Sequence, residues 1–139
     1  MAIRASVTLR NAALKGQSIA TLIDGTSGNG SIDIHVGAVN GSFGSPPAGA
    51  KLATLTLNRP SFGTPASGSM TAAAITSDIS ADASGTAASF VLRDSSGNIH
   101  LDGTVTVTAG GGDLVAASVT WTAGDTIACS SLIMSIPQS

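Results

Sequence analysis

The chain has very few of the side chains on which enzymes and metal sites depend. Its 139 residues include no Tyr, no Glu, one Cys and two His, and only 10% of the residues are charged. Soluble domains usually carry about 25% charged residues. General acid–base catalysis and metal coordination therefore have few candidate residues. We predict a protein that is not an enzyme and that needs no cofactor or metal.

Long hydrophobic runs and paired cysteines are also missing. A membrane-spanning helix needs about 20 apolar residues, and no run approaches that length. The start of the chain has no apolar stretch typical of a signal peptide, which predicts a protein made in the cytoplasm of its producer. Cys129 has no second cysteine to pair with. It lies in an apolar, strand-like run, so we expect a buried and unreactive thiol.

Small residues dominate what remains. Ala, Gly, Ser and Thr make up 74 of the 139 residues, and mean hydropathy is +0.36. A surface of small methyl and hydroxyl groups costs little to desolvate, so it suits burial against other protein. The net charge of −2 gives no attraction to nucleic acid or to an anionic membrane.

The basic residues Arg4, Arg10 and Lys15 precede the first acidic residue, Asp24. No aromatic residue lies among them, which argues against direct binding of nucleic acid. They are either the solvated side of a helix or a basic patch that docks on an acidic partner.

Alternating apolar and polar residues predict short strands separated by turns. The predicted strands are residues 3–9, 32–36, 52–58, 70–77, 87–94, 99–107, 114–121 and 126–137. The last strand changes phase, which predicts a bulge near Ser130–Ser131. Residues 94–98 form a predicted hairpin turn, and residues 40–50 and 59–69 are predicted loops. This pattern predicts an all-β fold, a β-sandwich or jelly roll of about eight strands, in a single domain over residues 1–139.

One N-terminal helix is expected beside the strands. Apolar residues recur at helical spacing through residues 9–23. Thr8 is placed to cap the start and Gly25 to end the helix. Gly16 lies in the middle and costs about 1 kcal/mol relative to Ala. The helix therefore needs a sheet to pack on.

Two carboxylate pairs are candidates for acid–base chemistry, Asp78 with Asp82 and Asp94 with Asp102. Each lies in or beside a Gly/Ser-rich turn, where Asp commonly binds its own backbone. We interpret these residues as turn formers and predict no catalytic residue.

The two histidines allow one metal hypothesis. His35 and His100 lie on the polar phase of their strands, with Asp33 and Asp102 two residues away in the same phase. Two His and two Asp can hold zinc if the two strands are neighbours. The alternative, which we favour, is a solvated sheet face with polar pairs across the strands.

The order of segments resembles the small capsid decoration, or cement, proteins of tailed bacteriophages. The resemblance covers nearly the whole chain. It rests on the N-terminal helix, the LATLTL…P-x-F step, the D-x-S-A-D-A-S-G-T-A connection and the final T-A-G-D-T-I…I-P strand. It implies a β-sandwich or jelly roll that binds the major capsid protein on the outer surface of the virion. It also implies a purely structural role, with no active-site residues.

Contact with a shell needs exposed side chains. Our candidates are two basic residues and four residues of the long loops: Arg4, Arg10, Phe43, Pro46, Pro47 and Phe62. The alternative is that both phenylalanine rings fold back into the ends of the sandwich. We also expect self-association, as a dimer or trimer on a symmetry axis.

Two other functions fit parts of the sequence. A tail or head–tail connector component would share the same composition. A carbohydrate-binding module would need an aromatic platform, but the chain has no Tyr, and Trp121 lies in a core-like strand.

Overall fold

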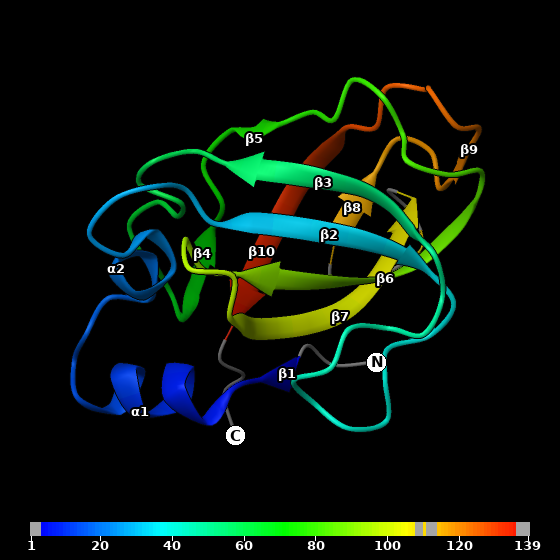
Figure 1. Ribbon diagram of the computed structural model, residues 1–139. Coiled ribbons are helices and arrows are strands. Elements are labelled where there is room, and N and C mark those ends of the chain that lie inside the picture. The colour runs from blue at the N-terminus through cyan, green and yellow to red at the C-terminus, as the bar shows by residue number, and fades with distance from the viewer. Residues whose placement is uncertain (1–3, 108–109, 111–113, 136–139) are drawn as a thin grey trace.

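The computed structural model describes residues 4–107, 110 and 114–135 (Figure 1). Its elements, in chain order, are β1 (Arg4–Ala5), α1 (Val7–Leu14), α2 (Ile19–Asp24), β2 (Ser31–Val36), β3 (Lys51–Leu57), β4 (Ser69–Thr71), β5 (Ile75–Thr76), β6 (Gly85–Arg93), β7 (Ile99–Val107), β8 (Leu114–Ala116), β9 (Thr120–Trp121) and β10 (Cys129–Ser135).

The described chain is mainly β, as predicted, and forms a curled open sheet with two helices. Eight strands follow the order β4-β10-β8-β7-β6-β2-β3-β5, while β1 pairs with β7 and β9 pairs with β6. Neighbours are antiparallel except for β7 and β8, which run parallel. In Figure 1, β3, β2, β6 and β7 form a front layer, and β10 crosses behind it.

The hydrophobic core lies inside this curl. Ile32 of β2 is opposite Leu55 of β3 on one side and Leu92 of β6 on the other, and Leu92 in turn is opposite Leu101 of β7. All four side chains are fully buried. Burying one such side chain stabilises the fold by about 1.5–3 kcal/mol, so this row is a major source of stability.

The N-terminal region differs from prediction, because two short helices replace the single one. Ser6, rather than Thr8, caps α1: its hydroxyl accepts the Leu9 N–H at 3.0 Å. The chain then turns at Gly16, whose φ of 78° stops the first helix. Gly25 ends α2, as expected. The predicted strand over residues 3–9 is therefore wrong beyond β1, since the Ser6 cap starts a helix there.

The region predicted as one strand over residues 70–77 divides into β4 and β5. Between them the backbone changes partners: the Ala72 N–H donates to the Leu132 carbonyl at 2.9 Å, and the Ala73 N–H to the Ser61 carbonyl at 2.9 Å. Residues 114–121 likewise divide into β8 and β9. The sequence pattern does not reveal where the backbone changes its pairing partner, because apolar and polar residues continue to alternate across that point.

Two finer predictions are confirmed. The 94–98 turn joins β6 to β7, with Gly97 at a φ of 92°. The pairing of β10 with β8 shifts register between Cys129 and Ser131, where the bulge was expected.

The thiol of Cys129 is expected to resist modification in the native protein. It is buried, and burial raises its pKa from 9.0 to about 12, so little thiolate exists near neutral pH. An aromatic disulfide reagent should label it slowly in buffer and fast in denaturant. Cys129→Ser supplies the blank, because the chain has no other cysteine. Fast labelling of the folded protein would contradict the buried position.

Candidate interaction surface

A row of side chains, polar except for the buried Val91, crosses the outer face of the front strands. In register the row runs Thr54–Asp33–Val91–Asp102–Arg4, over β3, β2, β6, β7 and β1. This face was predicted to be solvated. That prediction is wrong for both acids: Asp33 is buried, and Asp102 is only 1% exposed.

Each buried carboxylate of the row has a guanidinium partner. Arg93 Nε donates to Asp33 Oδ2 at 2.8 Å, and Arg4 Nε donates to Asp102 Oδ1 at 2.8 Å. Both arginines remain partly exposed. The hydrogen bonds to Asp102 raise the pKa of Arg4 above its ordinary value, against the opposing effect of burial. Such pairing is required, because an unpaired buried charge is costly.

The histidines of this face are not placed for a shared metal. β6 lies between their strands, β2 and β7. His35 Nδ1 lies 3.0 Å from the Gly49 carbonyl oxygen, whereas His100 lies between Ser6 Oγ and Asp94 Oδ2, at 2.9 Å from each. Both rings are buried, which also corrects the expected solvated positions. Within the described residues no group of three or more potential metal ligands occurs.

The turn interpretation of the acids holds for Asp78 and Asp94. Asp78 accepts the backbone N–H of Ser80 and of Thr54, each at 3.0 Å. Asp94 accepts two N–H groups within its own turn. Asp102 does not belong to this pattern, since it lies within β7 and pairs with Arg4.

We expect the Asp94 turn to make stability depend on acid pH. Burial acts to raise the pKa of Asp94. Hydrogen bonds from the side chains of Asn98 and His100, and from two backbone N–H groups, outweigh burial and hold the pKa below its ordinary value of 3.8. A lowered pKa in the folded state stabilises the protein above about pH 4, and this contribution is lost as the pH falls through the folded-state pKa.

The test compares wild type with Asp94→Asn in urea unfolding at several pH values. The difference in unfolding free energy should shrink as the pH falls from about 6 to about 2. Asp82→Asn removes a carboxylate from a half-exposed position and serves as the charge control. A difference that stays constant over this range would contradict the assignment.

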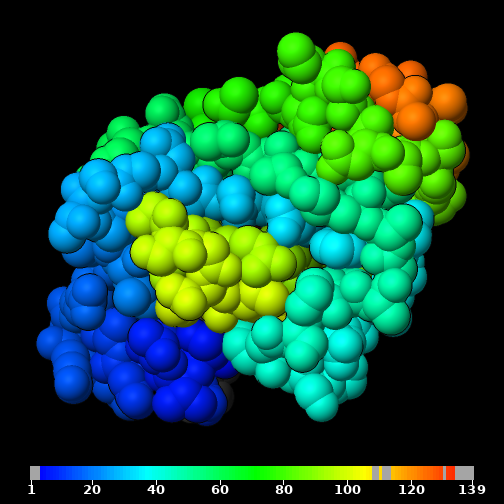
Figure 2. All heavy atoms as spheres, in the orientation of Figure 1, coloured from blue at the N-terminus to red at the C-terminus, as the bar shows by residue number. Residues whose placement is uncertain are grey.

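The loop over residues 40–50 packs against this polar face. Arg4 donates to the carbonyl oxygens of Asn40 and Gly41, and its guanidinium carbon lies 5.8 Å from the centre of the Phe43 ring. Figure 2 shows the loop in teal beside the blue N-terminal segment, with the yellow β6–β7 turn above both. Arg4 therefore joins the sheet to the loop and is not a free basic side chain.

Among the loop residues predicted as contacts, Phe43 is half-buried, Pro46 is exposed and Pro47 is buried. A partner can therefore reach Pro46 and one part of the Phe43 ring. The role of these residues in an interface stays a prediction.

Phe62 lies in the interior. Its side chain is 3% exposed, and its backbone bridges to Ala72. Of the two alternatives for this ring, the structure shows the one in which it packs into the core. Phe62 is therefore not an exposed anchor.

Helix α1 carries an exposed apolar strip that the sequence patterns did not reveal. Val7 is 61% exposed and Leu14 is 87% exposed. They lie seven residues apart, two helical turns, so they share one face, with the exposed Arg10 between them. A helix that begins after the Ser6 cap places Val7 and Leu14 on one face, whereas the alternation over residues 3–9 predicts a strand and hides the strip.

Comparison with protein-family models, curated proteins and solved structures found no match to this chain. Across the described ranges, neither helix has the length and apolar character needed to span a membrane.

Proposed function

We propose that this chain is a structural protein of a tailed-phage head, which decorates the outer surface and cements the shell against the pressure of packaged DNA. Its partners are then the major capsid protein and other copies of itself. The fold that goes with this role is the sandwich or jelly roll implied by the resemblance to decoration proteins. The low-charge, small-residue surface supports a role based on contact.

The strip formed by Val7, Arg10 and Leu14 is the observation that carries this proposal. Two large apolar side chains that stand in water beside a cation form a surface suited to an apolar partner with an acidic rim. Pro46 and the accessible part of Phe43 add a second point of contact. A clamp that binds only the assembled shell stabilises it by mass action, and many copies multiply the effect.

Binding to empty expanded shells is the direct test. We expect the protein to cosediment with shells of the major capsid protein of the same phage, and to raise the temperature at which they rupture. Leu14→Ser should weaken this binding by about tenfold or more, since it removes one central apolar contact.

The matched control is Ile79→Ser, because Ile79 is also exposed but lies in the connection between β5 and β6, away from α1 (Figure 1). Equal loss in both variants, or no binding by wild type, would contradict the proposal. Labelled protein found at the neck or tail in electron micrographs would favour a connector or tail component instead.

A further inference from the structure

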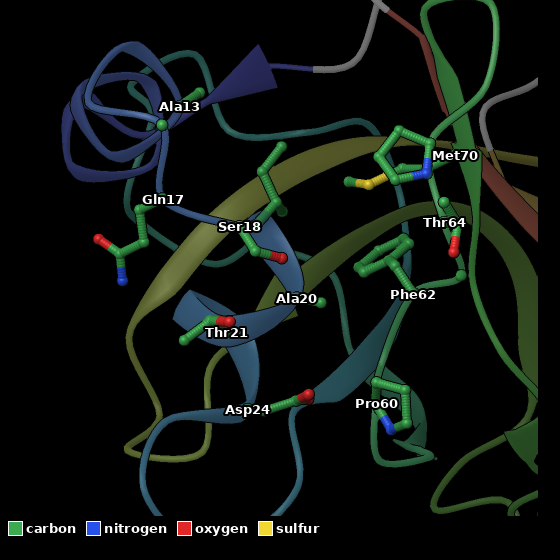
Figure 3. A pocket seen from close by; sticks show the side chains of 14 residues that line it. Ala13, Gln17, Ser18, Ala20, Thr21, Asp24, Pro60, Phe62, Thr64 and Met70 are labelled. Carbon is green, nitrogen blue, oxygen red and sulfur yellow. The ribbon is translucent and has the colours of Figure 1, made fainter.

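A cavity of about 550 Å³ lies between the helices and the loop that follows β3 (Figure 3). Small-molecule sites usually occupy about 300–1,000 Å³. One wall comes from the α1–α2 connection and α2, and the other from residues 60–65. The lining residues that matter for its chemistry are Ile19, Ala20, Asp24, Pro60, Phe62 and Met70. Apart from Asp24, these six are apolar, while Gln17, Ser18, Thr21 and Thr64 add uncharged polar groups to the same lining.

Among the described residues that line the cavity, Asp24 is the only charged one. Its side chain extends from α2 toward the Pro60 loop (Figure 3), and the residue is only 6% exposed. Oδ2 accepts the Ser61 N–H at 3.1 Å, whereas Oδ1 has no hydrogen-bond partner in the described part of the chain. The Ser61 hydroxyl is also buried and lacks a partner there, but Ser61 does not line the cavity.

The neighbouring cation does not neutralise this carboxylate. Arg59 Nη1 donates to the backbone carbonyls of Asp24 and Gly28, at 2.9 and 2.7 Å, and no ion pair joins Arg59 to Asp24 among the described side chains. A buried carboxylate without a cation is costly. A ligand that brings N–H donors and a positive charge would remove that cost.

We propose that this cavity binds a small primary alkylammonium ion. The ammonium group would lie at the Asp24 carboxylate, and the alkyl chain would pack on Phe62, Met70 and Ile19. An ammonium brings positive charge and only hydrogen-bond donors, which suits the Asp24 oxygen that lacks a partner. Charge-assisted hydrogen bonds are stronger than neutral ones, so the charge should dominate selectivity. This inference is independent of the proposed role in a phage head.

The experiment titrates the 13.5 kDa protein with pentylammonium chloride and, separately, with 1-pentanol, and follows amide shifts by NMR. We expect pentylammonium to bind about 10- to 100-fold more tightly than pentanol. Asp24→Asn should abolish that preference. It keeps an acceptor for the Ser61 N–H and so preserves the fold, while Asp82→Asn, a surface charge control, should leave the preference intact.

A second variant tests the location. Ala20→Leu should fill the space and weaken both ligands, because Ala20 lines the cavity. Equal affinity for the two ligands in wild type would overturn the proposal, even if a variant failed to fold. Absence of binding, or an unchanged preference in Asp24→Asn, would also overturn it. If Nα-acetyl-lysine amide bound but pentylammonium did not, the proposal would be overturned, and the cavity would instead be assigned to a lysine side chain of a partner.

Discussion

Replacing Trp121 with Ala should lower the free energy of unfolding by about 3–5 kcal/mol. Trp121 is 8% exposed and belongs to the core cluster, although β9 is only two residues long. Removing the indole leaves a large cavity that a rigid sheet cannot close. Urea unfolding should be followed by circular dichroism, because Trp121 is the only Trp and the variant loses its fluorescence signal.

Trp121→Phe is the matched control, since it keeps an aromatic ring in the same place and should cost less than Trp121→Ala. A loss below about 1 kcal/mol in the Ala variant would contradict a core position. The buried position also weakens the carbohydrate-binding hypothesis, which needs an exposed aromatic platform.

Gly49→Ala should lower the free energy of unfolding by about 3 kcal/mol, for a steric reason. A Cβ at Gly49 would lie 1.9 Å from the Val36 carbonyl oxygen, so the backbone of the loop must move away from β2. The same movement would disturb the contact of the Gly49 carbonyl with His35. Thermal unfolding measures the loss, and NMR shifts of residues 40–50 report the displaced loop.

Gly41→Ala is the control within the same loop. A Cβ there meets no atom within 4 Å, so its effect on stability should be close to zero. If the two variants proved equally stable, the close approach of the loop to β2 would be wrong.

Local signals predicted the hairpin well. The alternation from Ile99 to Val107 predicted β7 with its observed bounds, although the pairing with β6 shifts register beside the turn, between Leu92 and Arg93. The change of apolar phase within the last strand predicted its bulge, because one extra residue moves the following side chains to the opposite face. The helices were harder, because the apolar spacing continues across Gly16, whereas its positive φ breaks the hydrogen bonding.

Burial of the polar face was not predictable from spacing. Asp33 and Asp102 alternate with apolar residues, as residues on a solvated face do. The burial of these two carboxylates depends on partners that are distant in the sequence. Arg4, for example, lies 98 residues before Asp102. Phe62 lies in the interior because residues 61–63 pair with residues 71–73, a pairing that the composition of the loop does not indicate. Long-range contacts of this kind leave no periodic trace.

The ends of the sheet have a consequence for how copies of this chain can meet. β4 and β5, the outermost strands, have three and two residues, and the N–H groups of Ala72 and Ala73 between them are already bonded. Fibrils grow when a long free backbone edge accepts another strand. The described sheet offers only short stretches of this kind. Crowded copies should therefore join through side chains and loops, and a concentrated solution should resist conversion to amyloid.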